Sequence, residues 1–112
     1  MIGPQEFWEN YRQGIKEVKS ASPSTVEHYS SFYAKVMQDG ALSLKTKELI
    51  ALAIGLAIHC EHCIILHVRG ALKNGAALEE VWEAAQVGIA MGGGPAFTFL
   101  PLVKKAMEEF GS

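Results

Sequence analysis

Both cysteines of the chain and one histidine lie at spacings that suit thiol chemistry. Cys60 and Cys63 are three residues apart, and His67 follows the second cysteine after four residues. If this segment is helical, a rotation of about 100° per residue places the three side chains within about 60° of one face. Cβ atoms three and four residues apart on a helix are separated by about 5 to 6 Å. A disulfide can therefore join the cysteines, and the imidazole can take a proton from a thiol.

A Cys-x-x-Cys pair can perform both steps of peroxide reduction. The thiolate is the reactive form, and a helix that starts near Cys60 lowers the pKa of a thiol there through its free N–H groups and its dipole. Peroxide converts a thiolate to a sulfenic acid, with which the second cysteine condenses to form a disulfide. The helix start favours Cys60 as the thiolate, whereas the four-residue spacing to His67 favours Cys63.

Glu48 is an acidic residue that precedes the most apolar stretch of the chain. If the flanking helices form a hairpin that turns near His59, helix rise places Glu48 about 15 Å and His67 about 10 Å from the turn. Despite this mismatch of about one turn, the carboxylate could fix the imidazole tautomer or complete a proton relay. The alternative is a solvated glutamate in a first turn, beside Lys45 and Lys47.

Hydrophobic spacing predicts an all-α fold with six helices. Apolar residues recur at steps of three and four, and no period-two alternation persists. The expected helices cover Phe7 to Val18, Pro23 to near Asp39-Gly40, the Ser43 cap to about Ile58, the region of Cys60 to Asn74-Gly75, Leu78 to Met91, and a last stretch that carries Phe99 and Phe110. The Cys-x-x-Cys pair is thus expected at the start of the fourth helix.

The third helix is expected at the centre of a single domain that covers residues 1–112. Its all-round apolar character is typical of a buried helix. Gly55 costs helix stability, so we interpret it as the mark of a close crossing by another helix or by a partner subunit.

Composition narrows the class of protein. The 112 residues are 49% hydrophobic, which favours self-association of so small a core. Ten basic and twelve acidic residues are interleaved, so no basic stripe for nucleic acid is expected. The apolar stretch from Leu49 to Ile58 is shorter than a membrane span, and the first residues lack signal-peptide features. A cytoplasmic protein is expected, because two cysteines cannot build a multi-bridge secreted scaffold.

The joint spacing of the chemical residues closely resembles the alkylhydroperoxidase D (AhpD) core of the carboxymuconolactone decarboxylase-like superfamily. The matching pattern is Glu48, then Cys60-x-x-Cys63 with His62 between the cysteines, then His67. A lone Cys-x-x-Cys would not be specific, but this combination is.

The resemblance covers roughly Leu44 to Leu100 and implies an all-helical homo-oligomer, often a trimer or hexamer, with thiol-dependent peroxidase activity. It implies that Cys63 attacks the hydroperoxide and that Cys60 resolves the product, and we choose Cys63 as well because of its four-residue spacing to His67. The positions that match the family's proton relay are Glu48, His62 and His67.

The resemblance also implies an external dithiol reductant, such as a lipoyl group or a thioredoxin-like protein, and no bound cofactor. The chain is shorter than the two-core alkylhydroperoxidase that gives the family its name, so the reductant stays open. The true lactone decarboxylases of the superfamily generally lack the cysteine pair, which argues against decarboxylation.

Two other interpretations stay open beside the peroxidase or dithiol-disulfide oxidoreductase. The chain could be a non-catalytic oligomeric module that binds metal or senses redox state, because it holds enough ligands for a tetrahedral zinc site. These are His59, Cys60, His62, Cys63 and His67. The less favoured one is a cysteine-independent lactone decarboxylase.

Overall fold

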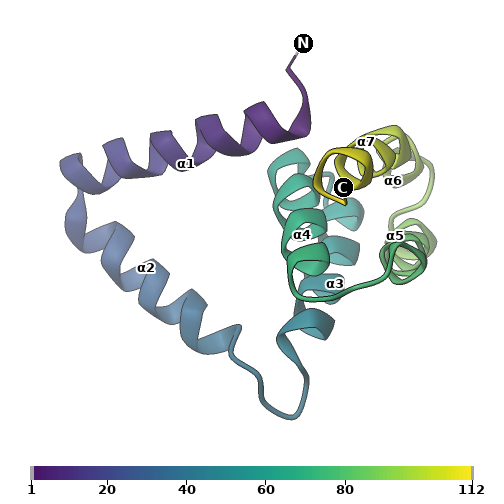
Figure 1. Cartoon of the computed structure of the whole chain (residues 1–112), viewed down its shortest axis with the longest axis horizontal. Helices are drawn as coiled ribbons and strands as arrows, with labels where there is room; N and C mark the ends of the chain where they lie inside the picture. Colours follow the sequence, from purple (N-terminus) through teal and green to yellow (C-terminus); the bar gives the residue numbers. More distant parts are fainter. Residues whose placement is uncertain (1, 112) are drawn as a thin grey trace.

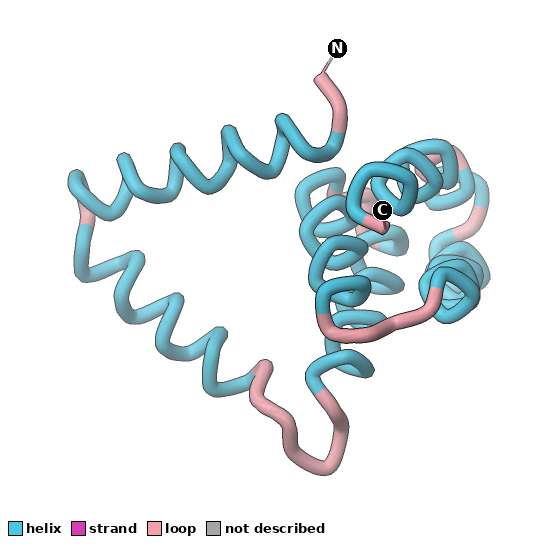
Figure 2. The backbone as a smooth tube through the Cα atoms, viewed as in Figure 1, coloured by secondary structure: helices cyan, strands magenta, loops and turns pink. Residues whose placement is uncertain are grey.

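Helices make up nearly all of the chain in the computed structural model, which describes residues 2–111 (Figures 1 and 2). They are α1 (Pro4–Ala21), α2 (Pro23–Val36), α3 (Leu44–Ala57), α4 (Glu61–Lys73), α5 (Leu78–Gly92), α6 (Gly94–Phe97) and α7 (Leu100–Phe110). Residues 2–111 contain no strand, so the predicted all-α class is confirmed. Six helices are long, as predicted, and the single turn α6 is an addition.

Two helix boundaries differ from the predicted ones, and features near the helix ends explain both. α2 ends at Val36 instead of near Asp39-Gly40, because Asp39 belongs to the next helix start. The Asp39 carboxylate accepts a hydrogen bond of 2.7 Å from the Leu44 N–H at the beginning of α3. α1 begins at Pro4, three residues before Phe7, since proline suits a first helical turn.

The core lies among α3, α4, α5 and α7, with α3 in contact with both α4 and α5 (Figure 1). The predicted central position of α3 is confirmed. The largest fully buried side chains of the core are Leu52, Leu56, Ile64, Ile65, Val68, Val81 and Val103.

Glycines allow the helices around α3 to approach closely. A Cβ atom added at Gly55 would lie 2.9 Å from the Cβ of Cys63 on α4. One added at Gly88 on α5 would lie 2.6 Å from the Ala53 carbonyl oxygen. Both distances are shorter than real contacts of Cβ atoms, so a side chain at either position would push two helices apart. Gly55 therefore marks a helix crossing, as predicted, and the crossing helix belongs to the same chain.

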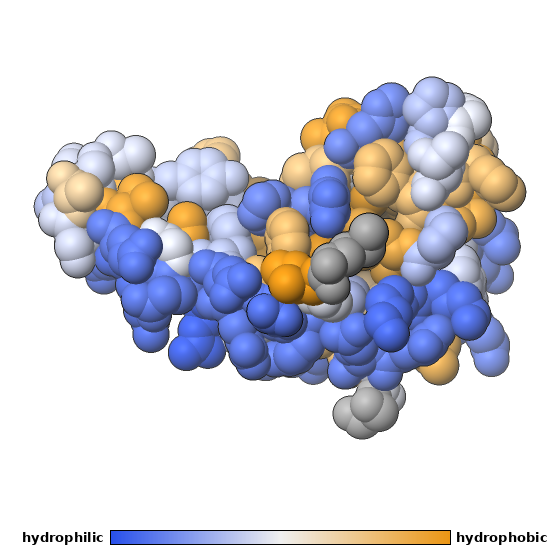
Figure 3. All heavy atoms as spheres, turned by 90° about the horizontal axis from the view of Figure 1, so that it is seen from above, coloured by the Kyte–Doolittle hydropathy of each residue, from blue (hydrophilic) through white to orange (hydrophobic). Residues whose placement is uncertain are grey.

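α1 and α2 project away from this bundle as two sides of an open triangle (Figures 1 and 2). α1 contacts α4 and α7, whereas α2 packs mainly against α1 and has no buried residue. Its exposed apolar side chains include Tyr29, Phe32 and Val36. Seen from the side of α1, hydrophobic side chains lie at the surface both over this pair of helices and over the bundle (Figure 3). Among the described residues, none of the helices is long and apolar enough to cross a membrane.

Candidate functional site

The turn between α3 and α4 sets Cys60 at the N-terminus of α4. His59 has a left-handed backbone with φ of 60°, which reverses the chain after α3. The Cys60 N–H then donates to the Gly55 carbonyl at 2.8 Å. Cys60 is the N-cap of α4, and its sulfur accepts a hydrogen bond from the Cys63 N–H at 3.2 Å. The predicted position of the pair at the start of the fourth helix is confirmed.

The two cysteines are free thiols, both partly buried, and they interact with each other. Burial and, to a smaller extent, the hydrogen bond with Cys60 together raise the pKa of the Cys63 thiol to about 11. Cys63 therefore keeps its proton at neutral pH in this arrangement, while the Cys60 sulfur is the acceptor within the pair. Attack by Cys63 requires a base that removes this proton as the reaction proceeds.

Glu48 and His67 meet between α3 and α4. The His67 Nδ1 atom lies 3.3 Å from the Glu48 Oε2 atom, and only 13% and 9% of these side chains are exposed. Gly70 stands opposite Glu48 on α4, and a Cβ there would collide with the carboxylate. The absence of a side chain at Gly70 thus makes room for the Glu48 carboxylate. Glu48 contacts His67 even though helix rise predicts that the two residues lie about one turn apart along the hairpin.

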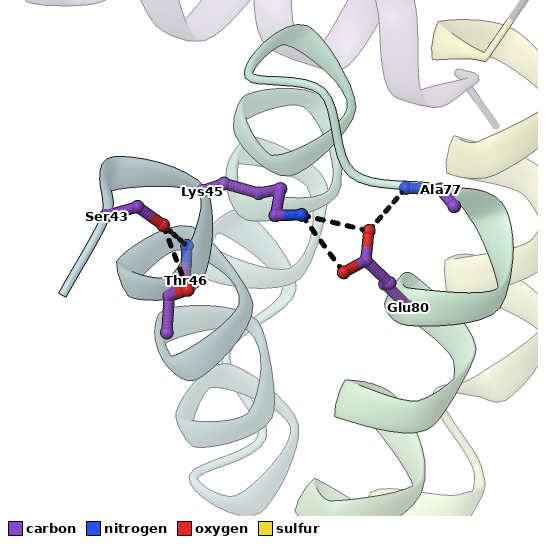
Figure 4. Close-up of polar contacts among 5 residues, drawn as sticks. All are labelled: Ser43, Lys45, Thr46, Ala77 and Glu80. Carbon is purple, nitrogen blue, oxygen red and sulfur yellow. Dashed lines mark hydrogen bonds and ion pairs between the residues drawn. The ribbon is translucent and has the colours of Figure 1, made fainter.

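The start of α3 is fixed by contacts to its own cap and to α5 (Figure 4). The Ser43 Oγ atom accepts a hydrogen bond from the Thr46 N–H at 3.1 Å. The Lys45 ammonium lies 3.1 Å from the Glu80 carboxylate, which also accepts from the Ala77 N–H at 2.9 Å. Both interactions stabilise the first turn of α3 and thereby position Glu48 in the next turn.

Both neighbouring lysines bond with partners other than Glu48. Lys45 is engaged by α5, and Lys47 donates to the carbonyl oxygens of Val36 at 2.7 Å and Gln38 at 2.6 Å. Taken as a whole residue, with its backbone, Glu48 is 7% exposed. It is the one charged residue in the described range that is buried. The alternative of a solvated first-turn glutamate is therefore wrong.

His62 projects to a different side of the site from His67. Its ring contacts Phe7 of α1, with centroids 4.5 Å apart, and Tyr11, with centroids 5.2 Å apart. Both contacts are edge-to-face, a favourable geometry for aromatic rings. The structure thus joins Cys60 to Cys63 and Glu48 to His67, and it brings His62 against α1. The relay role of His62 stays a prediction.

Tyr33 of α2 has a shifted pKa that the sequence did not reveal. Burial and, to a smaller extent, the Glu48 carboxylate raise the pKa of its phenol to about 12. In the sequence, Tyr33 belongs to an apolar stripe like those of the other helices. This shift depends on where α2 lies in the fold, so no local pattern could have identified it.

The candidate zinc ligands do not converge on one point. His59 stacks on Phe99, with ring centroids 6.2 Å apart, while His62 lies against α1 and His67 bonds with Glu48. In the part of the chain that the structure describes, no three or more His, Cys, Asp or Glu side chains are arranged to hold a metal ion. This donor arrangement does not fit a tetrahedral zinc site.

An all-helical bundle that carries a dithiol at a helix start and a buried Glu–His pair defines the class of protein. The carboxymuconolactone decarboxylase family is matched over residues 23–105, and the chain belongs to this family. The resemblance found in the sequence is thereby confirmed.

Solved structures of family members and a curated protein are similar to this chain. The crystal structure of apo-lpg0406, a carboxymuconolactone decarboxylase family protein from Legionella pneumophila, superposes with a TM-score of 0.92 at 31% identity and covers 97% of both chains. The family member TM1620 from Thermotoga maritima gives 0.81 at 27% identity, over 89% of this chain and 86% of that one. Uncharacterized protein 4 in the cox locus of Paracoccus denitrificans is 37% identical over 85% of this chain and 86% of its own length.

Proposed function

We propose that the protein is a thiol-dependent hydroperoxidase of the AhpD-like type. The observation that carries this proposal is the Cys60–Cys63 dithiol at the start of α4, with His67 of the buried Glu48–His67 pair about one helical turn further along the same helix. A dithiol supplies the two electrons that reduce a peroxide, and a Glu–His pair can accept the thiol proton. A role in antioxidative response has been suggested for the Thermotoga maritima relative, which supports the same chemistry.

The reaction divides the two cysteines between attack and resolution. A base takes the proton of the attacking thiol, and His67 is the candidate because it follows Cys63 by four residues and is held by Glu48. The sulfur forms a bond with one peroxide oxygen while the O–O bond breaks, which leaves a sulfenic acid and an alcohol or water. The second cysteine then attacks the sulfenic sulfur, and water leaves as the disulfide forms.

An external dithiol completes the cycle by exchange with the Cys60–Cys63 disulfide. A lipoyl group or a thioredoxin-like protein has the required chemistry, because either one becomes a disulfide as it reduces the site. The reaction needs no bound cofactor. Cys60 precedes the first turn of α4 and is partly exposed, which gives such a reductant access to one sulfur of the disulfide.

We also propose that the protein works as a homo-oligomer, a trimer or a hexamer. Two apolar surfaces of the chain lack a partner within it. The first is the apolar face of α2, which includes Tyr29, Phe32 and Val36. The second is a groove of about 420 Å³ between α3 and α5, whose lining includes Ile54, Val87 and Met91. Monomers rarely expose such large apolar patches, and a second copy would cover them.

Mass analysis of the intact protein after one equivalent of peroxide tests the catalytic proposal. The wild type should lose two hydrogen atoms as the disulfide forms, and Cys60→Ser should trap a sulfenic acid that adds one oxygen. Cys63→Ser should stay unmodified. If only Cys63→Ser traps the oxygen, the two roles are reversed, and inertness of all three proteins would exclude the peroxidase.

A further inference from the structure

The helix α2 carries an apolar stripe that its own chain leaves uncovered. Tyr29, Phe32 and Val36 follow one another at steps of three and four, so helix geometry places them within about 60° of one face. Their exposed fractions are 63%, 65% and 48%, and α2 has no buried residue. The carboxylate and the ammonium group of α2, on Glu27 and Lys35, lie about 90° or more from the centre of this stripe. The stripe can therefore enter an apolar groove without carrying a charge into it.

The groove between α3 and α5 has the matching character. It measures about 420 Å³, and among the described residues that line it only one threonine is polar. Small, less exposed residues form its floor, and larger, exposed residues form its rims. The floor residues are Ala53, Ala57, Ala84 and Gly88, and the rim residues are Ile50, Ile54, Val87 and Met91. The groove extends over Thr46 to Ala57 of α3, about 16 Å of helix, so it is long enough for the α2 stripe, which covers about 10 Å.

The stripe and the groove of one chain do not meet. The groove is lined by α3 and α5, whereas α2 packs mainly against α1. In the view of Figure 1, α5 lies beyond α3 as seen from α2. The family match nevertheless begins at residue 23, where α2 starts, so α2 is part of the shared domain. A helix that belongs to the domain but contributes nothing to its core is suited to contact with a second copy.

The area of the two surfaces indicates how copies of the chain pair. At their exposed fractions, the side chains of the stripe and of the groove rims each offer on the order of 100 Å². One stripe in one groove would thus cover about 700 Å², which is less than the roughly 1,200–2,000 Å² of a stable interface. If each of two copies places its stripe in the groove of the other, the covered area doubles to about 1,400 Å², which lies within this range. Such a reciprocal contact has twofold symmetry, the commonest symmetry of homo-oligomers.

We propose that two copies of the chain pair reciprocally, each placing its α2 stripe in the α3–α5 groove of the other. This inference rests on the proposed homo-oligomer and names the contact that builds it. Tyr29 and Phe32 are the anchors of the contact, because exposed aromatic side chains that enter an apolar groove supply much of the energy of an interface. The assembly is then made of twofold pairs, and three pairs give the hexamer in place of the trimer.

Site-specific crosslinking tests the contact. Cys60→Ser and Cys63→Ser remove the native thiols, after which one chain receives Phe32→Cys and another receives Val87→Cys. When the two proteins are mixed and allowed to exchange subunits, a short bismaleimide should join them into a covalent dimer that neither protein forms alone. Lys104→Cys serves as the control, because its exposed side chain on α7 lies outside the groove, and it should form no covalent dimer with Phe32→Cys. Tyr29→Cys with Met91→Cys is a second pair, for which the same products are expected.

A chain that carries both Phe32→Cys and Val87→Cys distinguishes a pair from a ring. Reciprocal contact closes two crosslinks within one pair, so the covalent product should stop at the dimer, and covalent trimers or longer chains would overturn reciprocal pairing. If the wild type sediments as an oligomer but Phe32→Cys links only to itself, α2 packs against α2, and the contact is overturned while the assembly stands. A wild type that sediments as a monomer, with the groove left to a lipid or another protein, overturns both.

Discussion

At the scale of single residues, the proton on Cys63 is the feature that any mechanism must explain. The Cys60 sulfur is the acceptor for the Cys63 N–H, and the Cys63 thiol is partly buried beside it. Reaction at neutral pH therefore depends on removal of a proton during attack, and not on a thiolate that exists beforehand at Cys63. The buried Glu48–His67 pair is suited to that task, since its imidazole can take up the proton while the carboxylate stabilises the resulting cation.

We expect half of Cys63 to be deprotonated near pH 11 in the reduced protein, compared with pH 9 for an ordinary thiol. Cys60→Ala should lower this value, because it removes the hydrogen bond between the thiols, but burial should keep it above pH 9. The pH dependence of iodoacetamide labelling, followed by mass analysis of the Cys63 peptide, measures it. A midpoint at or below pH 9 in the wild type contradicts the structure.

The same shift has a consequence for stability. Because the pKa of Cys63 is raised in the folded state, its contribution to the free energy of unfolding is present below about pH 9 and disappears as the pH rises through about 11.

At the scale of elements, local patterns could predict most of the helices but not the contacts that end them. Apolar spacing and the Ser43 cap identify α3, and glycine marks its crossing with α4. The end of α2 depends on Lys47, eleven residues beyond Val36, and α6 is too short for a period to be visible. Likewise, Cys60, Cys63 and His67 share one helix and could be predicted together. The raised pKa of Tyr33 could not be predicted, because it depends on where a whole helix lies in the fold.

The α3–α4 crossing should be sensitive to a single methyl group at Gly70. Gly70→Ala places a Cβ where the Glu48 carboxylate lies, so the carboxylate or α4 must move. We expect a loss of about 1–3 kcal/mol in the free energy of unfolding, typical of overpacking, together with slower reaction with peroxide. Denaturant titration and stopped-flow kinetics measure the two effects.

Gly14→Ala is the matched control for this substitution. Gly14 lies inside α1, where an added Cβ would meet nothing within 4 Å. Alanine there should stabilise the helix by about 0.5–1 kcal/mol and leave the kinetics unchanged. A Gly70→Ala protein as stable and reactive as the wild type would mean that Glu48 does not occupy this place.

At the scale of the whole molecule, the chain leaves two apolar surfaces open while its core is small. α2 has no buried residue, and the groove between α3 and α5 exposes Val87 and Met91. A short chain buries a modest share of its surface alone, so burial between copies would add substantially to stability. Assembly would also cover α2, which packs mainly against α1 in the single chain.

Sedimentation at micromolar concentration should show an oligomer. Met91→Glu places a charge in the groove, at a side chain that is 78% exposed in the single chain, and it should yield smaller species. Gln86→Glu adds the same charge on the same helix at an exposed position outside the groove, and it should leave the assembly intact. A wild-type monomer would contradict the proposed assembly.

The sulfur of Cys60 also caps α4, because it accepts a hydrogen bond from the Cys63 N–H. Oxidation of this sulfur therefore affects a hydrogen bond of the helix backbone. A serine or aspartate cap is permanent, but a sulfur that enters a disulfide becomes a poorer hydrogen-bond acceptor. Each oxidation would therefore weaken a cap of the kind that contributes about 1 kcal/mol to a helix, and each reduction would restore it. The first turn of α4 would thus loosen in the oxidised protein, at the moment when a reductant has to reach the disulfide. Hydrogen exchange at the Cys63 amide would report the redox state of the site.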